Sequence, residues 1–428
     1  MLKENCVKLN SGLQVITVPM PAFGSLTSLL LVNTGSRYED PKEQGMAHLL
    51  EHMVFRGTKK YPISHDLSIA FDSIGGSSNA FTSKEYTGYY VTSASTHLAH
   101  SLEMLRELIF FPLLREEDLE QEKAIVIEEI KMHLDSPEDF IADEFEQMVF
   151  ADTGLEHPIS GSIDLVKQQS VKSMRSFLQK WYGLENITLV LAGDAKVVEK
   201  IETIEKISQI FDEKLLLEGE LGERANHHQT RREKYIASNP ISPKKKLTRK
   251  KPTEQTHIVL GWPALKRDDP QRYVLTVLAT IIGGNRSSRL FQVVRETANL
   301  AYYVFADVDQ YHDAGILGAS AGLNSVKAKQ GINLIQKEFL QLASGKKPVT
   351  KGELKHAKEY LTGRILLGLE SSRAVAQHYG LSWLLLGRIE DPGEVIEGIK
   401  NVKLGEIGQL AKKIIKPDEM RLAMVGAK

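Results

Sequence analysis

The sequence His48-Leu49-Leu50-Glu51-His52 decides how the rest of this chain is interpreted. Its surroundings predict a helix from about Gln44 to Arg56, with Gly57 ending it. At about 100° per residue, the apolar side chains share one face of this helix, and the two histidines and Glu51 share the opposite face. Two histidines four residues apart can both ligate one metal ion. An ordinary solvated face is the alternative, but such a face usually carries Lys or Arg, and none occurs here before Arg56.

Zinc held by two histidines needs a third protein ligand and an open position for water. Candidates occur further along, where Glu122 and Glu129 are seven residues apart and share one helix face. That arrangement suits Glu129 as a ligand and Glu122 as a carboxylate that holds one of the histidines. Glu128 points about 100° away and is the poorer candidate, whereas His133 lies on the same stripe as Glu129 and remains an alternative ligand. Glu51 can reach a metal-bound water without being a ligand itself.

The order of strand and helix patterns predicts an α+β fold made of two homologous domains. In the first half, strands are expected at 7–9, 13–18, 25–32 and 187–192, with helices at 116–134 and 197–211. The second half repeats this order, with strands at 257–261, 314–322 and 420–425 and helices at 270–282, 326–344 and 351–367. Both halves close on a strand followed by glycine, which indicates an internal duplication. In each domain we expect a mainly antiparallel sheet with helices packed on one face.

The predicted N-terminal domain covers residues 1–222 and carries the histidine motif, and the predicted C-terminal domain covers residues 253–428. Residues 223–252 between them are polar and include the basic run 244–251. We interpret this stretch as a linker, because a nucleic-acid surface would also need interleaved aromatic residues and a positive net charge. The chain has 54 Lys and Arg against 55 Asp and Glu, so no nucleic-acid partner is expected.

Composition also bears on the cellular compartment. Among 428 residues Cys6 is the one cysteine, which excludes an internal disulfide and a multi-cysteine zinc site. No run of eighteen apolar residues occurs, so no transmembrane helix is expected. Residues 1–20 lack the pattern of a signal or transit peptide. The sequence as written predicts a cytoplasmic protein without membrane association, although a mature chain that had lost a leader would look the same.

With its flanks, the motif resembles the inverted zinc motif of the pitrilysin, insulysin and mitochondrial processing peptidase family. Glu129 follows His52 by 77 positions, and the segments Gly35–Glu39 and Phe55–Thr58 on either side of the motif are also similar. The resemblance implies one zinc ion per chain, held by His48, His52 and Glu129, with Glu51 as the general base. It implies further that a peptide binds as an added strand along a sheet edge formed by Asn79, Ala80, Phe81 and Thr82.

The second half of the chain carries its own part of the resemblance. Phe291–Glu296 and Leu300–Tyr302 resemble a family segment in which an Arg and a Tyr stand seven residues apart, here Arg295 and Tyr302. Asn299 is a departure, since relatives often carry Gly at this place. The resemblance implies that the pair approaches the zinc site from the second domain and holds the substrate carbonyl and the oxyanion.

The resemblance to this peptidase family also implies a function. We expect a zinc metalloendopeptidase that hydrolyses peptide bonds of oligopeptides or presequences inside a closed chamber. Small members of the family build this chamber from two chains of this length. We therefore expect a homodimer, with a heterodimer with a related subunit as the alternative, in which the partner chain supplies the Arg and Tyr pair. A catalytically silent structural subunit of the same fold is the competing interpretation. Such relatives usually lose ligands, whereas all of them are present here.

Overall fold

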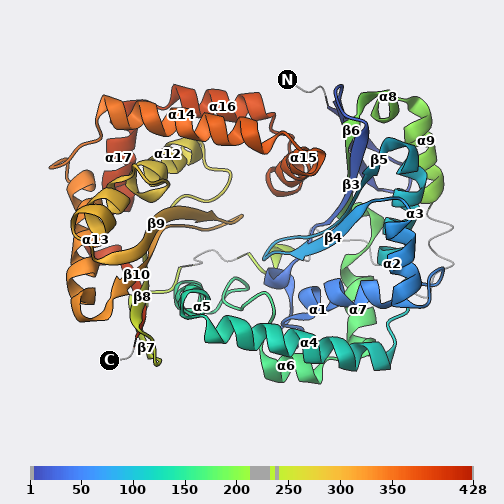
Figure 1. The fold of residues 1–428 in the computed structure, drawn as a ribbon, viewed down its shortest axis with the longest axis horizontal. Coiled ribbons are helices and arrows are strands. Elements are labelled where there is room, and N and C mark those ends of the chain that lie inside the picture. The colour runs from blue at the N-terminus through green and yellow to red at the C-terminus, as the bar shows by residue number, and fades with distance from the viewer. Residues whose placement is uncertain (1–3, 213–231, 237–240, 427–428) are drawn as a thin grey trace. The chain divides into compact units, whose positions relative to one another are not determined.

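A computed structural model of the chain describes residues 4–212, 232–236 and 241–426 (Figure 1). The described residues form two compact units, each with its own sheet. Unit 1 is drawn from residues 1–130, 157–235 and 367–391, and unit 2 from residues 131–156, 236–366 and 392–428. Each unit therefore combines most of one half of the chain with a smaller segment of the other half. In the part of the chain that is described, no helix is long and apolar enough to cross a membrane.

Unit 1 is built on a six-stranded sheet. Its strands are β1 (Asn5–Lys8), β2 (Gln14–Met20), β3 (Ser25–Val32), β4 (Ser77–Thr82), β5 (Thr87–Ala94) and β6 (Ile187–Asp194). Their order in the sheet is β1-β2-β6-β3-β5-β4, so β4 lies at one edge. β2 and β6 run parallel, and all other neighbours run antiparallel. The expected mainly antiparallel sheet is therefore confirmed.

Helices cover both faces of this sheet. One face packs against a core to which these helices contribute: α1 (Met46–Met53), α2 (Ser64–Asp72), α3 (Leu98–Phe110), α4 (Glu116–Asp135), α6 (Ile163–Gln168), α7 (Val171–Trp181), α8 (Ala195–Val198) and α9 (Ile201–Ile210). The other face packs against α15 (Ser372–Leu386), which brings Val375, Ala376 and Tyr379 onto the strands. The strands explain this second layer, because seven of the eight β3 residues are buried and such a strand needs cover on both faces.

Unit 2 repeats the arrangement with five strands. These are β7 (Lys246–Lys250), β8 (Gln255–Pro263), β9 (Ala301–Gln310), β10 (Gly315–Asn324) and β11 (Arg421–Gly426). Their order is β7-β11-β8-β10-β9, with β7 and β11 parallel and the remaining pairs antiparallel. The same order and directions occur in unit 1 for β2-β6-β3-β5-β4. This agreement supports the duplication inferred from the sequence.

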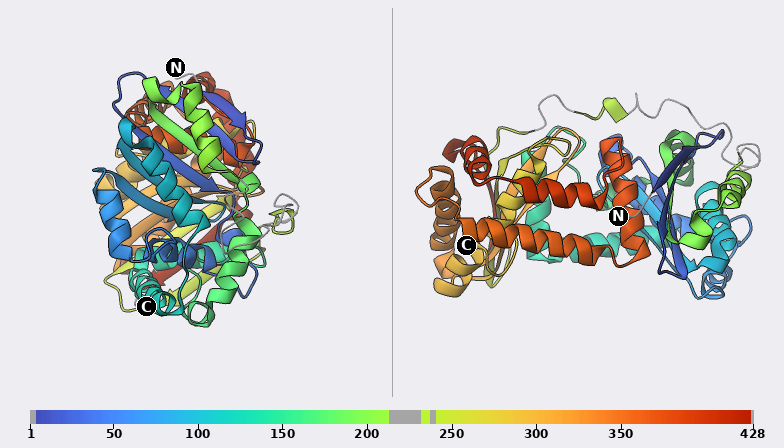
Figure 2. Two further views of the ribbon diagram at one scale, coloured as in Figure 1. Left: turned by 90° about the vertical axis from the view of Figure 1, so that its right-hand side faces the viewer. Right: turned by 90° about the horizontal axis from the view of Figure 1, so that it is seen from above.

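The unit 2 sheet also has helices on both faces. One face contributes to a core together with α12 (Arg272–Gly283), α13 (Ala328–Ala343), α14 (Lys351–Gly368), α16 (Pro392–Asn401) and α17 (Leu404–Ile414). α14 and α16 lie side by side, joined where the Lys358 ammonium donates to the Lys400 carbonyl (Figure 2). The other face is covered by α5 (Pro137–Val149), which follows its predicted cap Ser136. α5 thus covers the sheet that the second half of the chain mainly forms, and α15 covers the sheet that the first half mainly forms.

The predicted linker is only partly a connection. Of residues 223–252, those at 223–231 and 237–240 lie outside the described residues. Within the basic run, Lys246–Lys250 forms the edge strand β7, in which Leu247 is buried and the charged residues are exposed. Charged side chains are typical of an edge strand, because they discourage pairing with other chains. The same charges are typical of a solvated linker, which is why the sequence alone predicts a linker here.

Candidate metal centre

The local sequence explains why α1 presents its polar face outward. The helix covers Met46–Met53 and continues as a short 3-10 turn over Val54–Arg56. On one side its apolar residues are fully buried in the unit 1 core: Met46, Leu49, Leu50 and Met53. This burial fixes the rotation of the helix about its axis. The histidines of the motif and Glu51 consequently project from the opposite side.

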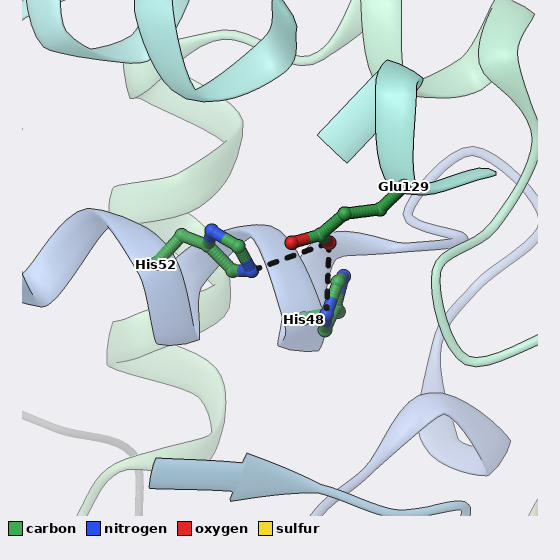
Figure 3. A group of neighbouring side chains, drawn as sticks. All are labelled: His48, His52 and Glu129. Carbon is green, nitrogen blue, oxygen red and sulfur yellow. Dashed lines mark ion pairs between the residues drawn. The ribbon is translucent and has the colours of Figure 1, made fainter. Parts of the chain in front are cut away.

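His48, His52 and Glu129 come together from α1 and α4 (Figure 3). The Nε2 atoms of His48 and His52 lie 3.8 and 3.6 Å from Glu129 Oε2, and the three possible ligand atoms all lie within 4.8 Å of one another. The side chains of the histidines are 19% and 21% exposed and that of Glu129 is 40% exposed. The group is therefore open to solvent on one side.

This group fits a zinc ion in kind and in spacing. Two imidazole nitrogens and one carboxylate oxygen are the ligand set of many catalytic zinc sites, and ligand atoms about 2.1 Å from a tetrahedral ion lie about 3.4 Å from one another. The 3.6 and 3.8 Å separations exceed that distance only slightly. Three α4 residues were candidates for the third ligand. Among the described residues Glu129 is part of the group, and Glu128 and His133 are not.

Glu122 orients one of the two histidines. Its Oε2 lies 3.0 Å from His52 Nδ1, and its Oε1 accepts a hydrogen bond from Arg56 Nε. With Nδ1 engaged, Nε2 is the nitrogen of His52 that faces Glu129. Glu122 lies where the sequence predicts a carboxylate beside a histidine, whereas the contact of Arg56 with Glu122 was not predicted. The signal for Arg56 was its position four residues after His52.

The charges around His52 favour a cation. Burial lowers the pKa of His52, but the hydrogen bond to Glu122 and the charges of Glu129, Glu122 and Glu51 outweigh burial and raise it. Burial likewise raises the pKa of Glu122, and its bonds to His52 and Arg56 outweigh that effect and lower it. The site therefore stabilises positive charge, which can be that of a proton or of a metal ion.

Glu51 interacts electrostatically with His52 and Glu129 and also contacts the edge strand. It receives a hydrogen bond from the Thr82 hydroxyl at the end of β4. Burial raises the pKa of the Glu51 carboxyl, although the Thr82 bond and the charge of His52 oppose the shift. The sequence predicts Thr82 as part of the substrate strand, and the contact of its side chain with Glu51 is an additional finding of the structure. The contact connects the helix motif directly to β4.

The other predicted substrate residues, Asn79, Ala80 and Phe81, lie on the same strand. Among the described residues β4 pairs with one strand only, β5, in a register that runs from Ser77 with Thr92 to Thr82 with Thr87. Its second edge thus offers backbone N–H and C=O groups that the sheet does not use. Asn79 is exposed, and its Oδ1 accepts a hydrogen bond from the Ala80 amide.

Arg295 and Tyr302 lie in unit 2, where the structure brings them together. The Arg295 guanidinium carbon lies 6.0 Å from the Tyr302 ring centroid, and the Tyr302 side chain is 74% exposed. Both line a cavity of about 620 Å³ at the start of the edge strand β9. Asn299, the departure noted in the sequence, has φ +50°. That is the left-handed conformation that glycine adopts most easily and asparagine tolerates.

Comparison with known proteins relates the chain to a family. Residues 19–162 match the family model described as insulinase, peptidase family M16, and residues 170–361 match the model described as the peptidase M16 inactive domain. An uncharacterized zinc protease of Bacillus subtilis is 32% identical over 95% of both chains. An uncharacterized zinc protease of Streptomyces coelicolor is 31% identical over 95% of this chain and 86% of the relative.

Solved structures show the same fold. A protease from Helicobacter pylori has a TM-score of 0.88 and 22% sequence identity, with full coverage of both chains. A peptidase M16 inactive domain from Pseudomonas fluorescens has a TM-score of 0.87 and 18% identity, covering 100% of this chain and 99% of the other. At these identities the likeness concerns the two-unit architecture.

Proposed function

Since the chain belongs to peptidase family M16, we propose that it is a zinc-dependent endopeptidase. The observation that carries the proposal is the meeting of His48, His52 and Glu129 beside Glu51, which is itself hydrogen-bonded to the edge strand β4. Metal ligands, a candidate base and a candidate substrate strand thus lie within one unit. A silent structural subunit would need none of these groups to meet.

In this proposal His48, His52 and Glu129 hold the ion, one per chain. The chemistry that zinc would supply there is that of a Lewis acid, which polarises water and the peptide carbonyl. Glu122 holds His52 in the orientation that ligation requires, with Arg56 holding Glu122 in turn.

Glu51 is the proposed general base. It takes one proton from the attacking water and passes it to the leaving amine, so that the hydroxyl ends on the carbonyl carbon and the proton on nitrogen. Burial raises the pKa of Glu51, which brings the carboxyl nearer to the pH range in which it can both accept and return a proton. The Thr82 hydroxyl keeps the carboxyl turned toward the strand where the peptide would lie.

The peptide is proposed to pair with the free edge of β4 along Asn79–Thr82. Main-chain hydrogen bonds of this kind give affinity that depends little on sequence, which suits a substrate class of oligopeptides or presequences. Arg295 and Tyr302 are proposed to hold the substrate carbonyl and the oxyanion. Their closeness to each other supports a joint role. We propose that the chain forms a homodimer in which the partner chain supplies this pair, as the resemblance to the family implies.

Metal content and peptide cleavage test the proposal together. We expect about one zinc per chain, and cleavage of a quenched-fluorescent peptide library that phenanthroline abolishes. Glu51→Gln should retain zinc and lose on the order of 10²-fold or more in turnover. Glu129→Gln should lose zinc, whereas Glu128→Gln, its neighbour on the same helix, should keep it. Full turnover in Glu51→Gln, or wild-type zinc content in Glu129→Gln, would contradict these assignments.

A further inference from the structure

A buried polar segment, Gly35–Glu39, precedes the zinc motif in the chain. Arg37 is 0% exposed and Glu39 is 5% exposed, although charged side chains seldom lie inside a protein unless they are paired. Each has its partners: Arg37 pairs with Glu85 at 2.8 Å, and Glu39 bonds to backbone amides. The two side chains contact two different parts of unit 1. Glu39 contacts the start of α1, and Arg37 contacts the turn that joins β4 to β5.

The first connection is to the helix α1. Glu39 Oε2 accepts a hydrogen bond from the Gly45 amide at 2.8 Å, and Oε1 accepts one from the Ala47 amide at 2.7 Å. These amides belong to the start of α1, where N–H groups have no partner within the helix. Gly45 itself has φ +86°, and a Cβ there would lie 2.5 Å from the Ser160 carbonyl oxygen. One carboxyl therefore holds the end of the helix next to His48.

The second connection is to the turn that joins β4 to β5. The Ser36 amide donates to the Ser83 carbonyl at 3.2 Å, and the Arg37 amide donates to the Lys84 carbonyl at 2.8 Å. The ion pair between Arg37 and Glu85 adds a side-chain bond to the same turn. Gly35 makes this approach possible, because a Cβ there would lie 2.1 Å from the Ser83 carbonyl oxygen.

We propose that residues 35–39 fix α1 relative to β4, with Glu39 as a positioning residue for the zinc ligands and Arg37 as a positioning residue for the substrate strand. This inference rests on the proposed function, because it assigns the two ends of the segment to metal binding and to peptide binding. Thr82, the last residue of β4, immediately precedes the turn that Arg37 holds, and its hydroxyl donates to Glu51. A displacement of about 1 Å at either end would disturb that contact, and misplacement on this scale can cost about 10²-fold in rate.

The two ends of the segment make different predictions. Glu39→Gln replaces one acceptor with an amide that cannot accept from a backbone N–H, so α1 loses one of its two bonds. We expect zinc affinity and kcat each to fall about tenfold, as for other groups that support metal ligands, with KM changed less than about twofold. Gly35→Ala should displace the β4–β5 turn, raise KM several-fold and leave zinc affinity unchanged.

A matched control distinguishes positioning from general stability. Glu353 also accepts a backbone bond near a helix start, from the Thr350 amide at 2.8 Å, and it pairs with Arg289 at 2.6 Å, but it lies in unit 2. Glu353→Gln should lower the unfolding midpoint without changing zinc affinity, kcat or KM.

Zinc affinity is measured in the absence of substrate, by competition with a chelating indicator, and kinetics are measured on the zinc-loaded full chain. The proposal is overturned if Glu39→Gln matches Glu353→Gln in zinc affinity and kcat. If Glu39→Gln does not fold, Glu39→Asp, which is too short to reach both amides, carries the same expectation. Retained turnover in Glu51→Gln would instead refute the proposed function. The zinc affinity of Glu39→Gln would then still test whether Glu39 positions the metal ligands.

Discussion

The buried carboxyl of Glu39 gives unit 1 a pH dependence that can be measured without zinc or substrate. Burial raises the pKa of Glu39 from 4.5 to about 8, although the hydrogen bonds from Ala47 and Gly45 and the charge of Lys84 oppose the shift. At neutral pH the folded chain therefore keeps a proton on a group that the unfolded chain would ionise. Glu39→Gln carries no ionisable group at this position and removes the effect.

The sign and size of the effect follow from linkage. Because the folded pKa lies above the unfolded one, the stability that protonated Glu39 contributes is fully present below pH 4.5 and is lost as the pH rises through about 8. Within that window the free energy of unfolding of the wild type should fall, relative to Glu39→Gln, by up to about 1.4 kcal/mol per pH unit. The total is about 5 kcal/mol. A difference in unfolding free energy that does not change with pH measures the lost hydrogen bond. The part of the difference that changes with pH measures the effect of the proton on Glu39.

Urea unfolding of the metal-free proteins at pH values from 5 to 8 measures this difference. Among the three tryptophans, Trp181 contributes a fluorescence signal from near Glu39, since it is fully buried and its ring centroid lies 5.9 Å from that of Tyr38, the residue before Glu39. Glu353→Gln is the control, because bonds from Arg289 and Thr350 lower the pKa of Glu353 to about 2 despite its burial. Its contribution is lost only in acid, so its difference from wild type should be flat from pH 5 to 8. If the unfolding free energies of wild type and Glu39→Gln changed with pH in parallel, the hydrogen bonds from the start of α1 would offset the whole effect of burial on the pKa of Glu39. That result would refute the predicted pH dependence.

Two further predictions concern the site itself. Glu122→Ala should weaken zinc binding by about 10- to 100-fold, because His52 loses the group that fixes its ring; chelator competition measures this, and wild-type affinity would remove the role given to Glu122. Co-expression of Glu51→Gln with Tyr302→Phe should restore turnover that neither variant has alone, if each active site takes Tyr302 from a partner chain. A mixed dimer that stays inactive would place both residues of a working site in one chain.

Patterns that depend on neighbouring residues were predicted well from the sequence. The helix carrying the motif, the α4 stripe with Glu122 and Glu129, and strand β3 all follow from periodicity within a short window. The pairing of α5 and α15 with sheets of the opposite half was not predicted. An apolar stripe shows that a helix will be buried, but it does not show which of two similar sheets will bury it. Contacts such as Thr82 with Glu51 depend on tertiary approach and leave no periodic signal.

The two units differ in that the histidine motif occurs in unit 1 and has no counterpart on the equivalent helix of unit 2. In unit 1, α1 follows β3 in the chain and contacts β4; in unit 2, α12 follows β8 and contacts β9. The two helices thus hold equivalent places, but nine of the twelve α12 residues are buried, and the helix contains no His, Asp or Glu. A helix that is buried over most of its surface and lacks these side chains strengthens its core and cannot offer ligands to an ion that a substrate must also reach. The polar face of α1 is not packed into the core in this way. Glu39 and the fully buried opposite face hold α1 in place instead, so support from outside the motif is what allows the motif to remain open.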